Sequence, residues 1–423
     1  MTEPPHSNAP PSLHDAAWLR RPETARVFAA LSGDGIETRA VGGAVRDELL
    51  GLDVTEIDFA TTATPDKVMA LARKAGLKAI PTGIEHGTVT VVADGMSFEV
   101  TTLRRDVETF GRHATVAFTQ DWAEDARRRD FTLNALYAGP DGRLYDPLHG
   151  YDDLAMGRVR FIGDAEARIK EDYLRILRFF RFNAYYGSLP LDEAGLAACV
   201  KLRTGLAQLS AERVAAELKR ILVAPKAMAA IEALFDHGLL TEILGSAPRL
   251  ERLARLAAIE TAQGRDPSAP LRLAALCVFV AEDAPRLAAR FKLSNAEQAM
   301  LALAADESLD TALPEERAAR RLLYRLGPEV YVSQVLLAWA DRGAPPDDAD
   351  WQRALTLPER WQAPSFPVRG PDIMALGDFK GPDIGERLRL LEQLWIDGDF
   401  AEDRDQLLLR AAELTRKSPK PDR

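Results

Sequence analysis

The chain has 423 residues, too many for one compact core, and two to four domains are expected. Its formal charge of −10, from 54 basic and 64 acidic residues, excludes a surface that is basic all over, so any nucleic-acid contact must come from local patches. Cys199 and Cys277, the only two cysteines, lie in apolar helical surroundings, which indicates a reducing compartment. No apolar run approaches the ~18 residues of a membrane span, and the start has no signal pattern, so we expect a cytoplasmic protein.

A glycine pair between a strand and a helix is the first candidate site. The pattern predicts a disordered proline-rich start (1–13), a helix (15–32) and a strand (37–41) before the pair, and a helix (45–50) after it. Backbone N–H groups at Gly42 and Gly43 could face a phosphate chain at the start of that helix. Arg46 follows, and its planar charge suits phosphate oxygens. We expect Gly43 and Arg46 to bind a triphosphate; the alternative is an ordinary glycine turn.

Two acidic residues follow in the β-prone stretch TEIDFAT. Glu56 and Asp58 would share one face of a strand, with Ile57 and Phe59 on the other face. Two carboxylates beside an anion-binding loop and an arginine indicate Mg²⁺ held between protein oxygens and a nucleotide triphosphate. The alternative is a solvated edge strand with incidental charges.

The whole arrangement, GG-x-VRD-x-LLG followed five residues later by acid-x-acid, resembles the first motif of a known family. The family comprises class II CCA-adding enzymes and bacterial poly(A) polymerases, template-independent RNA nucleotidyltransferases of the DNA polymerase β superfamily. It usually has Asp at both acid positions, whereas Glu56 stands at the first one here. The resemblance implies an α+β fold, in which a polymerase-β-like head of mixed sheet and helices precedes an all-α neck, body and tail.

The next stretch reads as a helix from Thr64 to about residue 75 and a hairpin over 88–102 that turns at Asp94-Gly95. Thr64 supplies a capping hydroxyl and Pro65 the first helical position. Glu99 falls on the polar face of the second arm. It could be a third acid beside Glu56 and Asp58, or an ordinary solvated glutamate.

Residues 103–120 lack a clear period and read as a mobile loop, and residues 121–136 read as a helix. Within that helix, the string RRDFTLNAL resembles the family's second motif, which recognises the nucleotide ribose. The arginine directly before the aspartate is Arg129, and the resemblance makes it the ribose ligand. Residues 146–160 match the third motif, a hinge, where Gly150 and Gly157 give backbone freedom and the head should end.

The second chemical motif is EDYLRILRFFRF, residues 171–182. On one helix, a carboxylate and three arginines at intervals of three would form a polar stripe, and the apolar residues between them would pack it in place. The members of this stripe are Asp172, Arg175, Arg178 and Arg181. The pattern resembles the family's fourth motif, which implies that Asp172 and Arg175 hydrogen-bond the base of CTP or ATP. We expect Arg178 and Arg181 to align the incoming nucleotide or to stack beside it. The alternative is an amphipathic helix with solvated arginines.

Residues 210–222 read as a capped helix that resembles the fifth motif, which braces the fourth. Apart from the resemblance, Ser210, Arg213 and Glu217 there would be ordinary capping and surface charge. Residues 158–220 hold twelve basic and eight acidic residues, and this local excess is where we expect the RNA 3′ end. Beyond about 225 the sequence predicts helices to about 340, with breaks at 264–270 and 310–314, then a loop at 342–350 and a tail.

The expected organisation follows from these motifs. The predicted parts are an N-terminal tail with the start of the first helix (1–24), a head (25–150), a neck with the nucleotide-selecting helix (151–225), a body (226–341) and a tail (342–423). The resemblance implies Mg²⁺-dependent addition of C, C and A to the tRNA 3′ end from CTP and ATP, with no membrane or DNA partner expected. Poly(A) addition and CC-only or A-only addition share the same motifs and stay open. A catalytically inactive RNA-binding module is the alternative from another class.

Overall fold

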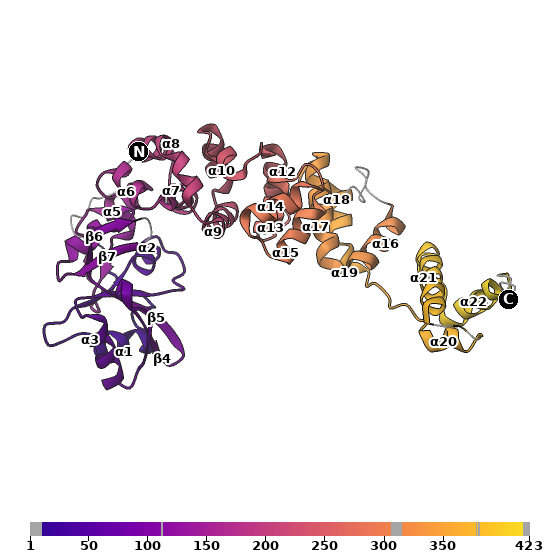
Figure 1. The fold of residues 1–423 in the computed structure, drawn as a ribbon, viewed down its shortest axis with the longest axis horizontal. Helices are drawn as coiled ribbons and strands as arrows, with labels where there is room; N and C mark the ends of the chain where they lie inside the picture. The colour runs from indigo at the N-terminus through magenta and orange to yellow at the C-terminus, as the bar shows by residue number, and fades with distance from the viewer. Residues whose placement is uncertain (1–10, 111–112, 306–314, 378, 380, 418–423) are drawn as a thin grey trace. The chain divides into compact units, whose positions relative to one another are not determined.

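The computed structural model describes residues 11–110, 113–305, 315–377, 379 and 381–417. The chain divides into two compact units, Met1–Ser246 and Ala247–Arg423, and many of their elements are labelled in Figure 1. Most of the start expected to be disordered, residues 1–10, lies outside the described residues. None of the helices in the described part of the chain combines the length and apolar character that a membrane crossing needs.

The first unit is built on a seven-stranded sheet in the order β3-β4-β5-β2-β1-β8-β9. β2 pairs with β5 in parallel, and the other neighbours pair antiparallel. The strands are β1 (Thr38–Val41), β2 (Asp58–Thr61), β3 (Lys78–Gly83), β4 (Thr88–Ala93), β5 (Met96–Thr102), β8 (Tyr137–Ala138) and β9 (Leu144–Tyr145). A mixed sheet followed by helices confirms the α+β class.

The local predictions around the first motif hold well. Helix α2 (Gly43–Leu49) follows β1 directly, and the hairpin β4–β5 turns at Asp94 and Gly95, whose φ angles of 47° and 87° suit a tight two-residue turn. Ile57 and Phe59 are buried while Glu56 and Asp58 are exposed, as the alternation predicts. However, β2 begins at Asp58, so Glu56 precedes the strand on which it was expected. Helix α3 (Pro65–Lys74) begins with Pro65 as expected, but the Thr64 side chain makes no capping hydrogen bond.

Three predicted elements of the head are wrong. The helix expected over 15–32 begins only at Pro22, as α1 (Pro22–Leu31). Arg21 precedes a proline, and the helical conformation is unfavourable for the residue before a proline, so the helix does not extend back through Arg21. The loop expected over 103–120 is the hairpin of β6 (Arg104–Phe110) and β7 (His113–Phe118). Its register shifts between Asp106 and Glu108, and such an irregularity breaks the alternation by which strands are recognised.

The helix expected over 121–136 is interrupted after its first turns. This stretch consists of α4 (Trp122–Arg127) and a 3₁₀ turn, η2 (Thr132–Asn134), and it ends just before β8. The Asp130 carboxylate accepts hydrogen bonds from the Phe131 N–H at 2.9 Å and from Asn134 at 3.0 Å. These local bonds compete with helical ones and explain the break.

Helices complete the first unit, together with two further 3₁₀ turns, η1 (Ile84–His86) and η3 (Arg203–Gln208). The helices are α5 (Gly150–Ala155), α6 (Ala165–Glu171), α7 (Leu174–Tyr186), α8 (Glu193–Lys201), α9 (Ala211–Leu222), α10 (Ala227–Asp236) and α11 (Leu239–Leu244). Gly150 does not act through freedom of its backbone: a Cβ there would lie 2.1 Å from the Thr132 carbonyl oxygen, so glycine permits close packing of α5 on η2. Gly157 has a φ of 64°, which suits glycine.

In the described residues of the second unit, all regular elements are helices, as predicted. Its helices are α12 (Leu250–Ala262), α13 (Ala269–Cys277), α14 (Asp283–Phe291), α15 (Asn295–Leu303), α16 (Glu316–Leu326), α17 (Pro328–Arg342), α18 (Ala349–Leu355), α19 (Leu357–Arg360), α20 (Gly370–Met374), α21 (Gly381–Asp397) and α22 (Arg404–Lys417). The expected break at 264–270 and the loop at 342–350 are confirmed, and the break at 310–314 lies outside the described residues. Cys199 and Cys277 are buried free thiols, and the domain boundaries within each unit stay predictions.

Candidate active site

A cleft of about 500 Å³ in the first unit brings the two chemical motifs together. The glycine turn, β2 and β5 line it from the sheet, and α7 and α9 contribute from the helices that follow. Seven of the nine predicted site residues line this cleft: Gly43, Arg46, Asp58, Arg129, Asp172, Arg175 and Arg178. Glu56 and Arg181 lie outside the lining.

The acidic side of the cleft is centred on Asp58. Asp58 opens β2 and pairs in register with Glu99 on β5, and both side chains line the cleft. Although the Asp58 side chain is exposed to the cleft, partial burial raises its pKa to about 6, and the negative charges of Glu99 and Glu56 add to this against the opposing effect of Arg129. Glu99 is therefore part of the acidic cluster, and Glu56, just before the strand, acts on it from outside the cleft lining.

This donor set suits a cation that the substrate helps to hold. Within the described part of the chain, no three or more His, Cys, Asp and Glu side chains form a complete metal site. Mg²⁺ commonly binds one or two carboxylates and completes its shell with water and substrate phosphates. A divalent cation at Asp58 would also offset the repulsion from Glu99 and Glu56, which adds to the effect of burial in raising the pKa of Asp58, so the residues fit such an ion.

The glycine turn places Arg46 in a buried position. Gly42 has a φ of 71° and links β1 to α2, a conformation that favours glycine. The Arg46 guanidinium donates to Asn134 Oδ1 at 2.7 Å, to the Tyr186 hydroxyl at 2.7 Å and to the Asp47 carboxylate at 2.9 Å. Arg46 therefore lines the cleft while it also connects α2 to the end of α7.

Arg129 lies where the chain leaves α4. Its guanidinium donates to Asp125 at 3.1 Å and to the Tyr137 hydroxyl at 3.2 Å. Burial alone would raise the pKa of Asp125, but Arg129 and Arg128 hold it below its usual value. Arg129 is thus fixed beside the glycine turn, where its Nη1 atom would lie 3.9 Å from a Cβ added to Gly42.

Asp172 is not on the nucleotide-selecting helix, which corrects the sequence reading. It lies between α6 and α7 in an extended conformation, with φ −156° and ψ 106°. Its Oδ1 atom accepts from the Leu174 N–H at 3.1 Å, at the first residue of α7, and side chains that bond a helix start lie outside the helix. Its Oδ2 atom accepts from Arg213 on α9 at 2.7 Å, so Asp172 is held from two sides.

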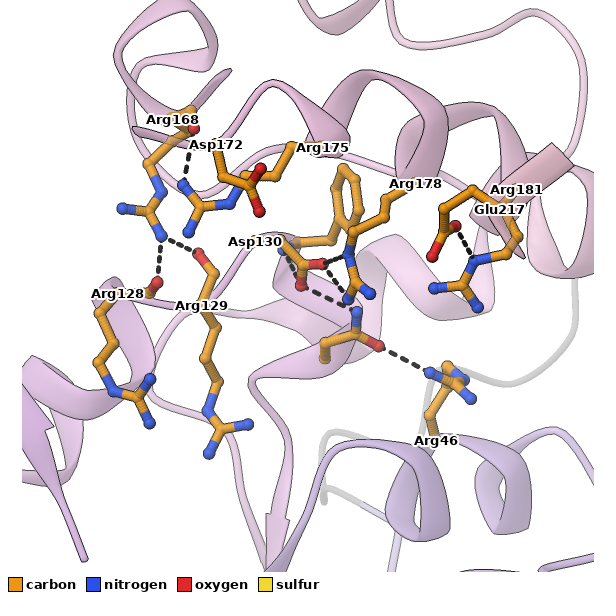
Figure 2. Close-up of polar contacts among 12 residues, drawn as sticks. Arg46, Arg128, Arg129, Asp130, Arg168, Asp172, Arg175, Arg178, Arg181 and Glu217 are labelled. Carbon is orange, nitrogen blue, oxygen red and sulfur yellow. Dashed lines mark hydrogen bonds and ion pairs between the residues drawn. The ribbon is translucent and has the colours of Figure 1, made fainter. Parts of the chain in front are cut away.

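Arg175 and Arg168 form a second fixed group beside Asp172 (Figure 2). Arg175 donates to the Arg168 carbonyl at 2.7 Å and to the Glu171 carboxylate. Arg168 in turn donates to the carbonyls of Arg128 and, at 2.6 Å, Arg129. α6 therefore positions both Arg175 and the backbone that carries Arg129.

The last two arginines of the stripe point to different partners. Arg178 donates through Nε to Asp130 at 2.8 Å, and Arg181 donates through Nε to the buried Glu217 of α9 at 2.6 Å (Figure 2). Burial alone would raise the pKa of Asp130, but Arg178 and nearby hydrogen bonds hold it at about 2. Arg178 lines the cleft, whereas Arg181 ties α7 to α9 beside it.

The sequence reading missed several positioning residues. Apart from the resemblance of 210–222 to a bracing motif, Arg213 and Glu217 gave only capping and surface charge as their roles, yet each pairs with a member of the predicted stripe. Asp130 and Asn134 occur in the quoted string RRDFTLNAL, which was their only signal. Asp130 and Arg178 are 48 residues apart, and no spacing rule could have paired them.

Comparisons with known proteins cover most of the chain. Residues 38–160 match the poly A polymerase head domain, and residues 189–253 match the family described as the probable RNA and SrmB-binding site of polymerase A.

The mitochondrial CCA tRNA nucleotidyltransferase 1 of Mus musculus is 36% identical over 384 residues, covering 88% of this chain and 86% of the relative. The CCA-adding enzyme of Geobacillus stearothermophilus is 32% identical over 415 residues, covering 94% of this chain and 98% of the relative. The crystal structure of the Bacillus stearothermophilus CCA-adding enzyme in complex with CTP is 29% identical, with a TM-score of 0.73, covering 93% of this chain and 97% of that one.

Together, the head and the cleft that it shares with α7 define a nucleotidyltransferase with a polymerase-type head. The similarity extends well beyond the head, over most of both units and most of each relative's length. The chain belongs to the family of CCA-adding tRNA nucleotidyltransferases.

Proposed function

We propose that this protein adds C, C and A to the 3′ end of tRNA from CTP and ATP, without a nucleic acid template and with release of pyrophosphate. The observation that carries the proposal is that one cleft holds both the acids of β2 and β5 and the charged residues around α7. A nucleotide bound in this cleft would contact both the residues proposed for nucleotidyl transfer and those proposed to select the base. A CCA-adding enzyme of 29% identity has been solved with CTP, and structures of the same fold have been solved with ATP and with tRNA, and we propose these three as the partners of this protein.

We further propose that Mg²⁺ is the ion at this site, held by Asp58 and Glu56. When bound, it would lower the pKa of the primer 3′-hydroxyl and stabilise the charge on the leaving pyrophosphate. The register pairing of Asp58 with Glu99 supports Glu99 as a third acid of the same cluster. Because each carboxylate would supply only part of the ion's shell, binding should depend on the nucleotide triphosphate.

The remaining residues bind and orient the nucleotide. In this proposal, Gly43 and Arg46 hold the triphosphate and Arg129 holds the ribose. Asp172 and Arg175 present acceptor and donor groups that match a base edge. Arg178 aligns the nucleotide directly, while Arg181 acts through its ion pair with Glu217, which keeps α7 in place.

A cytoplasmic location is also our proposal, supported by the two free thiols and by the charge pattern of the chain. Cell fractionation with an antibody against the protein would test it. Recovery in a membrane-bounded organelle would contradict it.

The function is tested by incubating the purified protein with a tRNA transcript that lacks CCA, with CTP, ATP and Mg²⁺. The proposal expects a product extended by C, C and A and no further. Long A tails would identify a poly(A) polymerase, and products that stop after CC would identify a CC-adding enzyme. Absence of any extension, together with CTP binding that does not depend on Mg²⁺ in calorimetry, would favour the inactive module.

A further inference from the structure

Asn134 occupies an unusual place between the two sides of the cleft. Asn134 is the last residue of η2 and is only 8% exposed, and both the oxygen and the nitrogen of its side-chain amide make hydrogen bonds. Its Oδ1 atom accepts from Arg46 at 2.7 Å, and its Nδ2 atom donates to Asp130 Oδ1 at 3.0 Å. A guanidinium can only donate and an ionised carboxylate can only accept, so these two partners fix the orientation of the amide.

The hydrogen bonds continue from Asp130 into α7. The second oxygen of Asp130, Oδ2, accepts from Arg178 Nε at 2.8 Å (Figure 2). Arg46, Asn134, Asp130 and Arg178 thus form one chain of hydrogen bonds from α2 to α7. Arg46 makes a second link to α7 through the Tyr186 hydroxyl, so the helix is held from α2 at two points.

We propose that Asn134 is a positioning residue that couples the triphosphate-binding side of the cleft to the nucleotide-selecting helix. The inference rests on the proposed roles of Arg46 and Arg178. A fully satisfied buried network holds its members in one geometry, so both sides present their groups to the nucleotide together. A defect at Asn134 should therefore disturb base choice and phosphate binding at once, although the residue acts through its neighbours.

The test uses Asn134→Asp, which keeps the size of the side chain. The new carboxylate still accepts from Arg46 but cannot donate to Asp130, and it adds a second negative charge beside it. The control is Asn183→Asp on α7, where Asn183 is 6% exposed, donates to the Phe179 carbonyl at 2.9 Å and does not line the cleft. The readouts are kcat/KM for CTP relative to UTP on tRNA lacking CCA, and the inhibition constant of pyrophosphate.

For Asn134→Asp we expect the CTP preference to fall and the pyrophosphate inhibition constant to rise, each by about tenfold, the size of one lost hydrogen bond to a charged group. The control should change neither readout. Combined with Arg178→Lys, Asn134→Asp should add little further loss of CTP preference, because both substitutions break the same chain, whereas Asn183→Asp and Arg178→Lys should act independently.

Equal losses for CTP and UTP, unchanged pyrophosphate inhibition, or additive effects of Asn134→Asp and Arg178→Lys would each overturn the coupling. The proposed function is judged separately on the unsubstituted protein. If that protein extends tRNA by CCA and Asn134→Asp gives any of these results, only the coupling fails. If it extends no tRNA, the proposed function fails, and the coupling with it.

Discussion

The two sides of the cleft use charge in opposite ways. On the sheet side, Asp58 faces the further carboxylates Glu99 and Glu56, and its pKa is raised. On the helix side, the charged groups are matched by partners of opposite sign, as Arg178 is by Asp130 and Asp172 by Arg213. A cluster of acids is prepared to accept a cation, whereas paired groups are held ready to present fixed hydrogen bonds. From this difference we expect the rate of nucleotide incorporation to depend on the sheet side and the choice of nucleotide to depend on the helix side.

The largest expected effect is that of Asp58→Ala. Loss of the central carboxylate should reduce nucleotide incorporation by at least about 10³-fold, because several kcal/mol of charge stabilisation by the ion would be lost. The fold should stay intact, since the side chain is exposed to the cleft. Single-turnover incorporation and thermal unfolding would measure both quantities. Asp66→Ala, at an exposed position in the first turn of α3, is the control, and appreciable activity of Asp58→Ala would remove the metal role.

Substitution on the helix side should alter choice more than rate. Asp172→Ala and Arg175→Ala each remove one base-edge partner, and we expect the preference for CTP over UTP and GTP to fall by about tenfold to a hundredfold. Incorporation of each of the four nucleotides alone on a tRNA lacking CCA measures this. Nucleotide preferences equal to those of the unsubstituted protein would exclude a selecting role for these residues.

The raised pKa of Asp58 predicts a pH dependence with a definite sign. The carboxyl keeps its proton up to about pH 6, and a protonated carboxyl does not bind a cation. At fixed Mg²⁺, activity should therefore fall as the pH drops below about 6, by about tenfold per unit if one proton is involved. Because the ion competes with the proton, a higher Mg²⁺ concentration should lower the pH at which activity falls. If that pH does not depend on the Mg²⁺ concentration, Asp58 is not a ligand of the ion.

The smallest effect concerns the support of α7. Glu217→Ala would leave Arg181 without its main partner, and we expect the free energy of unfolding to fall by about 2 kcal/mol. Chemical denaturation of the protein measures this loss. Glu212→Ala, at an exposed position of the same helix, should be nearly neutral. Equal stability of the two variants would show that Glu217 does not brace α7.

Local patterns predicted the elements that local forces determine. The glycine turn after β1, the hairpin β4–β5 and the alternation around Asp58 depend on turn chemistry and period, and each was found as expected. Asp172 was misplaced because its carboxylate bonds the start of α7 instead of continuing the helix. The break after α4 likewise depends on the Asp130 side chain, which competes with helical hydrogen bonds.

Contacts between distant segments could not be predicted in this way. The pairs Asp130–Arg178, Asp172–Arg213 and Arg181–Glu217 join residues 36 to 48 positions apart, and only the folded chain brings them together. The resemblance to a family supplied roles for the cleft residues and a bracing role for the helix over 210–222, but not the pairs of side chains that make these contacts. The helix-side network is therefore knowledge that the structure adds.

The central claim is that the sheet side of the cleft determines the rate of nucleotide incorporation and the helix side determines which nucleotide is added. Competition between CTP and ATP on a tRNA that ends in CC tests it most directly. Equal CTP and ATP would be supplied to the unsubstituted protein and to Asp172→Ala in single-turnover reactions, and both the total rate and the identity of the added nucleotide would be recorded. The account expects the unsubstituted protein to add A, and Asp172→Ala to add C as well as A at a similar total rate. A large fall in total rate with A still the only nucleotide added would contradict it.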